Sequence, residues 1–162
     1  MINNAEKEFL TVRDLLREGK AGESLEQLNL VLTRYPDFGK AQAFLGHIHF
    51  RYFRDYVKAE EILKAAMVHS AHYDEVYYDY AELLLVTEKY TETVAVLNKS
   101  LEVSGIKKEK IYLLFGKLYE RQGRYDEAVE YYNKGMLYTF SIREMDNFQL
   151  DIERCIRKKN LI

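Results

Sequence analysis

The most constraining feature of this 162-residue sequence is a period of 34 or 35 residues. Tyr56, Tyr90 and Tyr125 mark the period most clearly. Further columns of similar residues keep the same spacing: Ala59, Thr93 and Ala128; Leu28, Leu63, Leu97 and Tyr132; Val31, Ala66, Ser100 and Gly135; and the pairs Leu45-Gly46, Tyr80-Ala81 and Phe115-Gly116. A fixed period of this length is the signature of stacked, similar units, each of which packs on its neighbours.

Each unit has the pattern of two amphipathic helices. In the fourth unit, Tyr112, Phe115, Gly116 and Tyr119 follow the i, i+3, i+4, i+7 spacing of one helix face. Gly123 interrupts this spacing, and a second helix face follows with Tyr125, Ala128, Tyr132, Gly135 and Met136. Proline also breaks helices, but the chain has only one, Pro36, and this favours long helices over many turns.

Small residues recur on both helices of each unit. Gly46, Ala81 and Gly116 on the first helix are expected to face Ala59, Thr93 and Ala128 on the second. Side chains of this size allow two helices to approach closely, and the large residues between them fill the remaining space.

A single longer helix is expected after the fourth unit, over about residues 142–159. Met145, Phe148, Ile152 and Cys155 form one apolar stripe along it. The opposite face is charged, with Arg143, Glu144, Asp151, Arg154 and Lys158. A stack of repeats needs a terminal element with one polar face, so this segment is predicted to be a capping helix.

These columns resemble the tetratricopeptide repeat, a helix-turn-helix of 34 residues. The fourth unit matches best, through Tyr112, Phe115-Gly116, Tyr119, Gly123, Tyr125, Ala128 and Tyr132, and the resemblance covers roughly residues 5–142. It implies an all-α, right-handed superhelical solenoid of four helix-turn-helix repeats plus a C-terminal capping helix. The implied organisation is a single domain, 1–162, with repeats at about 5–38, 39–73, 74–108 and 109–141.

Two departures from the family pattern make specific structural predictions. Gly46 and Ala59 are 13 positions apart, whereas the equivalent residues of the third and fourth units are 12 apart. We therefore expect one inserted residue in the turn at 51–54. The third unit lacks a terminal proline, and Gly105 is expected to end its second helix in a left-handed conformation.

The resemblance also implies a function, because the family binds extended peptides or partner helices in a concave groove lined by the first helix of each repeat. Carried over by position, the groove residues are Phe9, Arg13, Arg17, Lys40, His47, Phe50, Arg51, Tyr78, Asp79, Glu82, Lys117 and Arg121. Arg13, Arg17, Lys40 and Arg51 are expected to attract acidic groups. The aromatic rings of Phe9, Phe50 and Tyr78 are expected to be exposed for apolar contacts. The alternative is that all these residues belong to ordinary solvated helix faces.

Other partners remain open at this point. A second interpretation is a structural self-assembly element, in which an exposed apolar edge at Tyr131, Tyr138 and Phe140 pairs two copies. Chaperone-binding members of the family hold a C-terminal carboxylate with a Lys and an Asn of the first repeat. Phe9 and Arg13 occupy those positions here, so a chaperone tail is not the expected ligand.

Overall charge disfavours nucleic acid as a partner. The formal net charge is −2 and the pI is near 6.1, whereas nucleic-acid-binding domains are strongly basic. The cations Arg154, Arg157, Lys158 and Lys159 are interpreted as complementing the dipole at the end of the last helix. Nucleic-acid binding through the basic ends of the groove is the third alternative.

Membrane insertion and secretion are likewise not expected. No apolar run is long enough to span a bilayer, and the first residues show no secretory leader. The single cysteine, Cys155, excludes an internal disulfide and fits a reducing compartment, so the predicted location is cytoplasmic.

No motif of catalysis or of metal binding is present in the sequence. A Gly-rich phosphate loop and a nucleophile elbow are both missing, and Cys155 falls on an apolar stripe. His47 and His49 point to nearly opposite sides of a helix, and His69 and His72 have no third ligand at a suitable spacing. We therefore predict a non-enzymatic protein without metal or cofactor.

Overall fold

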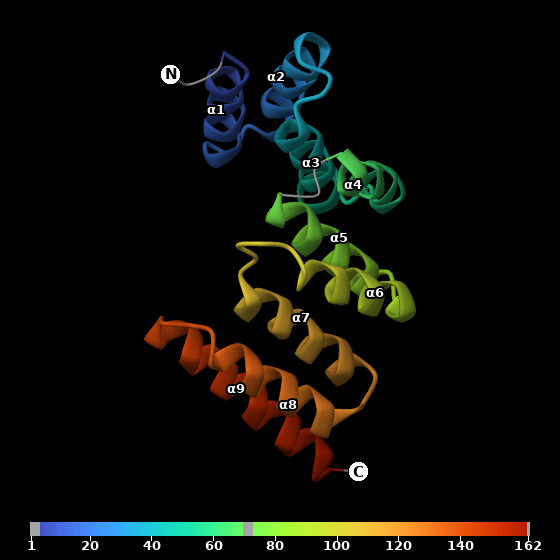
Figure 1. The fold of residues 1–162 in the computed structure, drawn as a ribbon, viewed down its shortest axis with the longest axis vertical. Helices are drawn as coiled ribbons and strands as arrows, with labels where there is room; N and C mark the ends of the chain where they lie inside the picture. Colours follow the sequence, from blue (N-terminus) through green and yellow to red (C-terminus); the bar gives the residue numbers. More distant parts are fainter. Residues whose placement is uncertain (1–3, 70–72, 162) are drawn as a thin grey trace. The chain divides into compact units, whose positions relative to one another are not determined.

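The structure, a computed structural model, describes residues 4–69 and 73–161, without the side chain of His69. All regular structure in these residues is helical (Figure 1), as predicted. The elements are α1 (Asn4–Arg17), α2 (Ala21–Arg34), α3 (Gly39–Ile48), the π-helix η1 (His49–Phe53), α4 (Tyr56–His69), α5 (Asp74–Val86), α6 (Tyr90–Ser100), α7 (Lys108–Arg121), α8 (Tyr125–Met136) and α9 (Ile142–Lys159).

The chain forms two compact units, Met1–Leu83 and Leu84–Ile162, and the boundary falls inside α5. Within the first unit, α1 packs on α2, α2 on α3 and α3 on α4. Within the second, α6 packs on α7, α7 on α8 and α8 on α9. The helix pairs follow the period of the sequence, whereas the assignment of residues 1–162 to one domain stays a prediction.

Each unit has its own apolar core, built from the helix faces that the periodicity marks. In the first unit the core consists of Phe9, Val12, Leu16, Leu28, Val31, Ala41 and Ile48. In the second it consists of Ala128, Tyr132, Phe148, Ile152 and Cys155. The column that holds Leu28, Leu63, Leu97 and Tyr132 is fully buried, so these large residues are packing residues of the repeats.

The helical glycines allow close packing, but against different partners from those expected. A Cβ placed on Gly116 would lie 2.3 Å from the ring of Tyr132, and one on Gly46 would lie 2.6 Å from Leu63. The nearest atoms thus belong to the large column of the second helix, and not to Ala59 or Ala128. In the fourth repeat, the absence of a side chain at Gly116 makes the space that the ring of Tyr132 occupies.

The predicted insertion in the second repeat is accommodated by the π-helix. A π-turn holds one residue more than an α-turn, because each N–H donates five residues back along the chain. The backbone N–H of Arg54 donates to the carbonyl of His49, five residues earlier. The extra residue therefore widens the last turn after α3, and α4 keeps its place in the repeat.

The turn between the two helices of each repeat contains a left-handed residue. Its φ is +79° at Gly19, +54° at Arg54, +61° at Glu88 and +72° at Gly123. Gly105 is left-handed as predicted, with φ +81°, but it does not end the helix: α6 ends at Ser100, and Gly105 lies in the turn that follows. Glycine adopts this conformation freely, whereas other residues lose about 1–2 kcal/mol in it.

This column of turns makes a prediction about stability. We expect Gly123→Ala to lower the free energy of unfolding by about 1 kcal/mol, because alanine must adopt the left-handed conformation. Glu88→Gly should leave that free energy unchanged or raise it by less than about 1 kcal/mol, since relief of strain is partly offset by the greater freedom of glycine in the unfolded chain. Urea denaturation monitored by circular dichroism measures both. Equal destabilisation by the two substitutions would contradict the assignment.

The last helix has the predicted bounds and a buried stripe that is shorter than expected. Phe148, Ile152 and Cys155 are buried, whereas Met145 is exposed. Ser141 precedes the helix and its side chain accepts a hydrogen bond from the backbone N–H of Glu144. Among residues 4–69 and 73–161, no helix combines the length and the apolar character needed to cross a bilayer.

Candidate protein-interaction surfaces

In the first unit, the first helices of successive repeats lie side by side. The rings of Phe9 in α1 and Phe44 in α3 meet edge to face, with centroids 5.2 Å apart. Lys40 in α3 pairs with Glu6 in α1 at 2.7 Å. Arg51, just after α3, pairs with Asp79 in α5. We call the solvent side of α1, α3–η1 and α5 within this unit the first-helix face.

Four of the predicted groove residues form one polar cluster on this face: His47, Arg51, Asp79 and Glu82. Asp79 is buried; its Oδ2 lies 2.9 Å from Nδ1 of His47, and its Oδ1 accepts from Nη2 of Arg51 at 3.2 Å. The same nitrogen of Arg51 donates to Glu82 at 2.6 Å. The sequence predicts these residues as separate ligand contacts, but the structure pairs them with one another.

The cluster neutralises the charge of Arg51 within the molecule. Burial lowers the pKa of Arg51, but the hydrogen bond that Arg51 donates to Glu82 and the charges of Glu82 and Asp79 outweigh burial and raise that pKa above its ordinary value. Its guanidinium also lies over the ring of Phe50, 4.5 Å from the centroid. Arg51 is therefore held by its own unit on several sides.

The other predicted cations of this face are less constrained. Arg17 pairs with Asp14 at 2.9 Å, and both side chains are exposed. Lys40 is exposed in its pair with Glu6. Arg13 makes no ion pair in the part of the chain that the structure describes. Burial raises the pKa of Tyr73, just before α5, and the charge of Arg13 opposes that rise. Exposed pairs of this kind contribute only about 0–1 kcal/mol, so a competing carboxylate exchanges with them readily.

The expected exposure of the three aromatic groove residues is wrong. Phe9 is 3% exposed, Phe50 5% and Tyr78 8%. Phe9 packs edge to face against Phe38 and Phe44, and Phe50 packs against Tyr56. Tyr78 belongs to a run of six consecutive buried residues, 76–81. Because six residues span more than one helical turn, this part of α5 is covered on all sides. These rings contribute to packing and not to an accessible apolar surface.

Lys117 and Arg121, the groove residues predicted on α7, belong to the second unit. Arg121 donates to the backbone carbonyl of Leu85 at 3.1 Å, so its guanidinium caps the end of α5. Lys117 is half-buried and forms no ion pair among the described residues. These two residues are therefore not part of the first-helix face, which lies in the first unit.

A second charged network, which was not predicted from the sequence, is centred on Glu120 of α7. Its carboxylate accepts from Arg154 at 2.6 and 2.7 Å, from Lys158 at 2.8 Å and from the hydroxyl of Tyr132 at 2.8 Å. Burial raises the pKa of Glu120, but these hydrogen bonds outweigh burial and lower the pKa to about 2. Lys159 pairs with Asp126 at 2.6 Å. The basic end of α9 thus attaches this helix to the fourth repeat, in addition to complementing its dipole.

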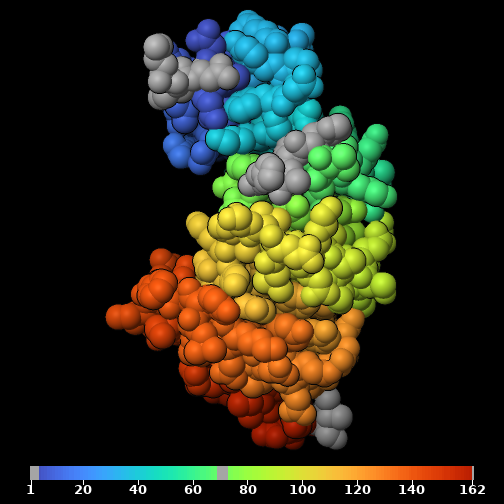
Figure 2. All heavy atoms as spheres, in the orientation of Figure 1, coloured from blue at the N-terminus to red at the C-terminus, as the bar shows by residue number. Residues whose placement is uncertain are grey.

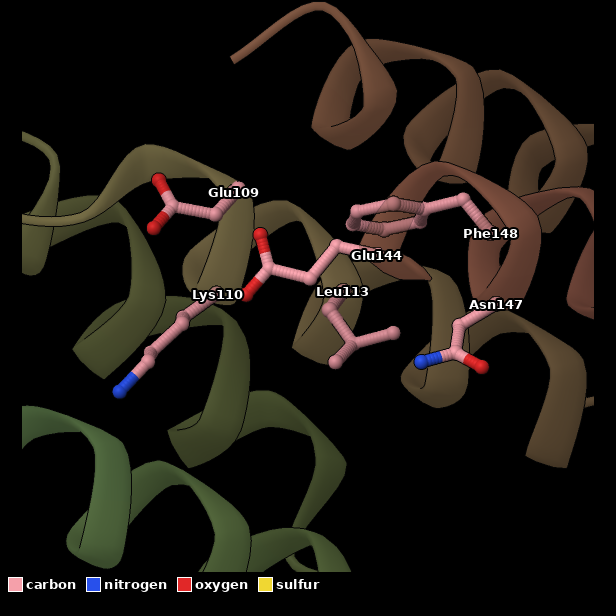
Figure 3. Close-up of a pocket in the computed structure, with 6 residues that line it drawn as sticks. All are labelled: Glu109, Lys110, Leu113, Glu144, Asn147 and Phe148. Atoms are coloured by element: carbon pink, nitrogen blue, oxygen red, sulfur yellow. The ribbon is translucent and has the colours of Figure 1, made fainter. Parts of the chain in front are cut away.

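A cavity of about 250 Å³ lies between α7 and α9 in the second unit. It is lined by Glu109, Lys110, Leu113, Glu144, Asn147 and Phe148. Figure 3 shows Glu109, Lys110 and Glu144 toward one end of the cavity, and Leu113, Asn147 and Phe148 toward the other. An apolar wall with a few polar groups at its edge is suited to hold an apolar side chain of a partner.

Metal ligands and nucleophiles do not gather in the described residues. In residues 4–69 and 73–161, no three His, Cys, Asp or Glu side chains lie close enough to hold a metal ion. His69 and His72 were not expected to bind metal, and His72 lies outside the described residues. His49 is buried, and burial together with the charge of Lys58 lowers its pKa. Cys155 is buried, and burial raises the pKa of its thiol to about 11, so the nucleophilic thiolate is disfavoured.

The sequence itself matches one family model over a limited range. Residues 109–139, which cover α7 and α8, match the model of the tetratricopeptide repeat. The chain has the tetratricopeptide-repeat fold. This confirms the resemblance stated from the sequence and the all-α class. No curated protein matches the sequence.

Solved structures support the same fold. The tetratricopeptide-repeat protein TTC0263 of Thermus thermophilus matches with a TM-score of 0.79 and 17% identity, over 93% of this chain and 82% of that one. PilF of Pseudomonas aeruginosa matches with a TM-score of 0.83 and 16% identity, over 96% and 69%. MamA of Desulfovibrio magneticus RS-1 matches with a TM-score of 0.71 and 16% identity, over 98% and 92%. At these identities the likeness concerns the fold alone.

Proposed function

We propose that this protein is a non-enzymatic interaction module of the cytoplasm, which binds a peptide or partner helix through its first-helix face. The tetratricopeptide-repeat fold is typical of protein–protein interaction modules, and this supports a role in binding another protein. The observation that carries the site is the connected face of α1, α3 and α5, on which Arg13, Arg17 and Lys40 present charges that no buried pair holds. The single cysteine supports the reducing location.

The proposed ligand is a segment that carries acidic side chains. Its carboxylates replace Asp14 at Arg17 and Glu6 at Lys40, at little cost because both of these pairs are exposed. Arginine binds a carboxylate with two parallel hydrogen bonds, which gives the contact direction as well as strength. Arg51 has a different role in this proposal: with Asp79 and Glu82 it fixes α3–η1 against α5, and so it positions the face.

A charge-reversal experiment tests the first-helix face. We expect the double substitution Arg13→Glu, Arg17→Glu to reduce recovery of the partner from an extract of the source cells by about tenfold, because like charges then face the acidic ligand. Recovery is measured by affinity purification and quantitative mass spectrometry. Binding to the unmodified protein should also weaken as salt concentration rises.

The matched control reverses the same number of charges on a second helix. Lys58 and Lys64 are exposed on α4, and neither forms an ion pair in the described part of the chain. The variant Lys58→Glu, Lys64→Glu should retain the partners that the first variant loses. Equal recovery with both variants would exclude the first-helix face as the binding site.

A second candidate function is self-association, and one observation favours it. Phe140, between α8 and α9, is 102% exposed, and its neighbours Leu137 and Ile142 are 82% and 77% exposed. The edge expected from the sequence is only partly present. Tyr131 stacks on Phe115 and Tyr119 at 4.7 and 5.1 Å and is half-buried. The exposed apolar surface is therefore centred on Phe140 rather than on the tyrosines.

A further inference from the structure

The second unit carries an apolar protrusion where α8 gives way to α9. We call Leu137, Tyr138, Phe140, Ile142 and Met145 the α8–α9 corner; all five side chains are exposed. In Figure 2 the segment that follows α8 stands out from the rest of this unit. Scattered exposed apolar residues are ordinary, but five within nine positions form a patch of the kind that marks an interaction site.

The same unit carries a cavity that suits an aromatic ring. The space between α7 and α9 measures about 250 Å³ and is walled by Leu113 and Phe148. A dry cavity of about 150 Å³ lined by similar side chains takes up benzene. Phe140 is fully exposed and so does not fill this cavity in its own chain. The unit therefore presents both an aromatic protrusion and a cavity of adequate size.

The charges beside the two features are complementary. Arg143 lies within the corner, between Ile142 and Met145; it is exposed and forms no ion pair in the described part of the chain. At one end of the cavity, the carboxylates of Glu109 and Glu144 accompany the single ammonium of Lys110 (Figure 3). Glu109 also forms no ion pair among the described residues. An acidic end of the cavity thus matches a free cation next to the protruding ring.

We propose that a second copy of this chain inserts its Phe140 into the α7–α9 cavity, with Arg143 of that copy paired to Glu109. The inference rests on self-association, the second candidate function, and names its site. Protrusion and cavity lie on one unit, so two copies related by a twofold axis make the contact twice, each ring entering the cavity of the other. A second copy is the occupant that supplies the ring and the matching cation together.

The proposed contact buries a small surface. Each side chain of the corner removes roughly 100 Å² from water, so ten of them, five from each copy, bury roughly 1,000 Å². That area is near the lower limit for a specific interface, at about 1,000–1,200 Å². The dimer should therefore be weak and reversible, with a Kd in the micromolar range.

Sedimentation velocity over a range of protein concentrations tests the contact. We expect Phe140→Ser to raise the dimer Kd by about tenfold or more, because each copy then lacks the central aromatic anchor of the contact. Arg143→Glu should raise it by about tenfold, since two pairs of like charges then meet. The double variant Arg143→Glu, Glu109→Arg should restore the Kd to within about threefold of the original value. Val57→Ser, at a site of α4 that is 83% exposed, should leave the Kd unchanged.

The outcomes separate the site from self-association itself. A strict monomer at all concentrations would overturn both. A dimer whose Kd responds to neither Phe140→Ser nor Arg143→Glu would leave self-association standing and overturn the cavity as its site. Loss of affinity in the single charge variant without recovery in the double variant would overturn the pairing of Arg143 with Glu109.

Discussion

Gly116→Ala should lower the free energy of unfolding by about 2 kcal/mol, although alanine is the better helix former. The added Cβ would lie 2.3 Å from the ring of Tyr132, which is fully buried and cannot move aside without disturbing the core of the second unit. Gly22→Ala is the matched control, because Gly22 is helical, is exposed and has no atom within 4 Å of the new Cβ. There the same substitution should raise stability by about 0.5 kcal/mol.

The sequence of the protein itself supplies a compensating change. At the two corresponding positions the third repeat carries Ala81 and Leu97 in place of Gly116 and Tyr132. The two substitutions should thus be coupled. The double variant Gly116→Ala, Tyr132→Leu should lose at least about 1 kcal/mol less free energy of unfolding than the two single variants lose in sum. Urea denaturation of the four proteins measures this coupling. Strict additivity would mean that the glycine does not make space for the ring.

Glu120→Gln should lower the free energy of unfolding by about 2–3 kcal/mol, the second large effect. The side chain of Glu120 is only 9% exposed and accepts from two cations and one hydroxyl. Glutamine keeps the shape, but it removes the carboxylate that pairs with Lys158 and leaves Arg154 paired with Asp151 alone among the described residues. Glu153→Gln is the control, because Glu153 pairs with Arg157 at 3.7 Å on the outside of α9, where the loss should be within about 0.5 kcal/mol.

The same carboxylate makes the stability of the protein depend on pH. Because the folded state lowers the pKa of Glu120 from 4.5 to about 2, its contribution is complete above pH 4.5 and is lost as pH falls from 4.5 toward 2. Glu120→Gln should lack this component, so the stabilities of the two proteins should converge in acid and differ most near neutral pH. A constant difference from pH 7 to pH 2 would contradict the assigned network.

The period, the helix pairs and the inserted residue were all predictable from sequence. The insertion is visible because one residue too many between Gly46 and Ala59 must be absorbed somewhere in a stack of fixed geometry, and a π-turn does this with least disturbance. Burial of the aromatic groove residues was not predictable by position alone. Phe9 is covered by Phe38, at the end of its own repeat, and by Phe44 of the next one, and the spacing of residues along one helix anticipates neither ring.

The charged networks could also have been predicted from the sequence. Residues about one period apart lie on neighbouring helices of a stack, so opposite charges at that separation tend to pair. Lys40 and Glu6 are 34 positions apart, Arg154 and Glu120 are 34 apart, and Lys159 and Asp126 are 33 apart. His47 and Asp79 are 32 apart. A comparison of charges between adjacent repeats would have separated the cations held internally from those left for a partner.

Site-specific photo-crosslinking tests the proposed first-helix face most directly. A photoreactive phenylalanine derivative is placed at Arg13 or Lys40 on this face, or at Lys64 on the exposed side of α4. The protein is irradiated in an extract of the source cells, and crosslinked partners are identified by mass spectrometry. We predict that Arg13 and Lys40 capture the same protein and that Lys64 does not. Capture of that protein from Lys64 alone would contradict the proposal.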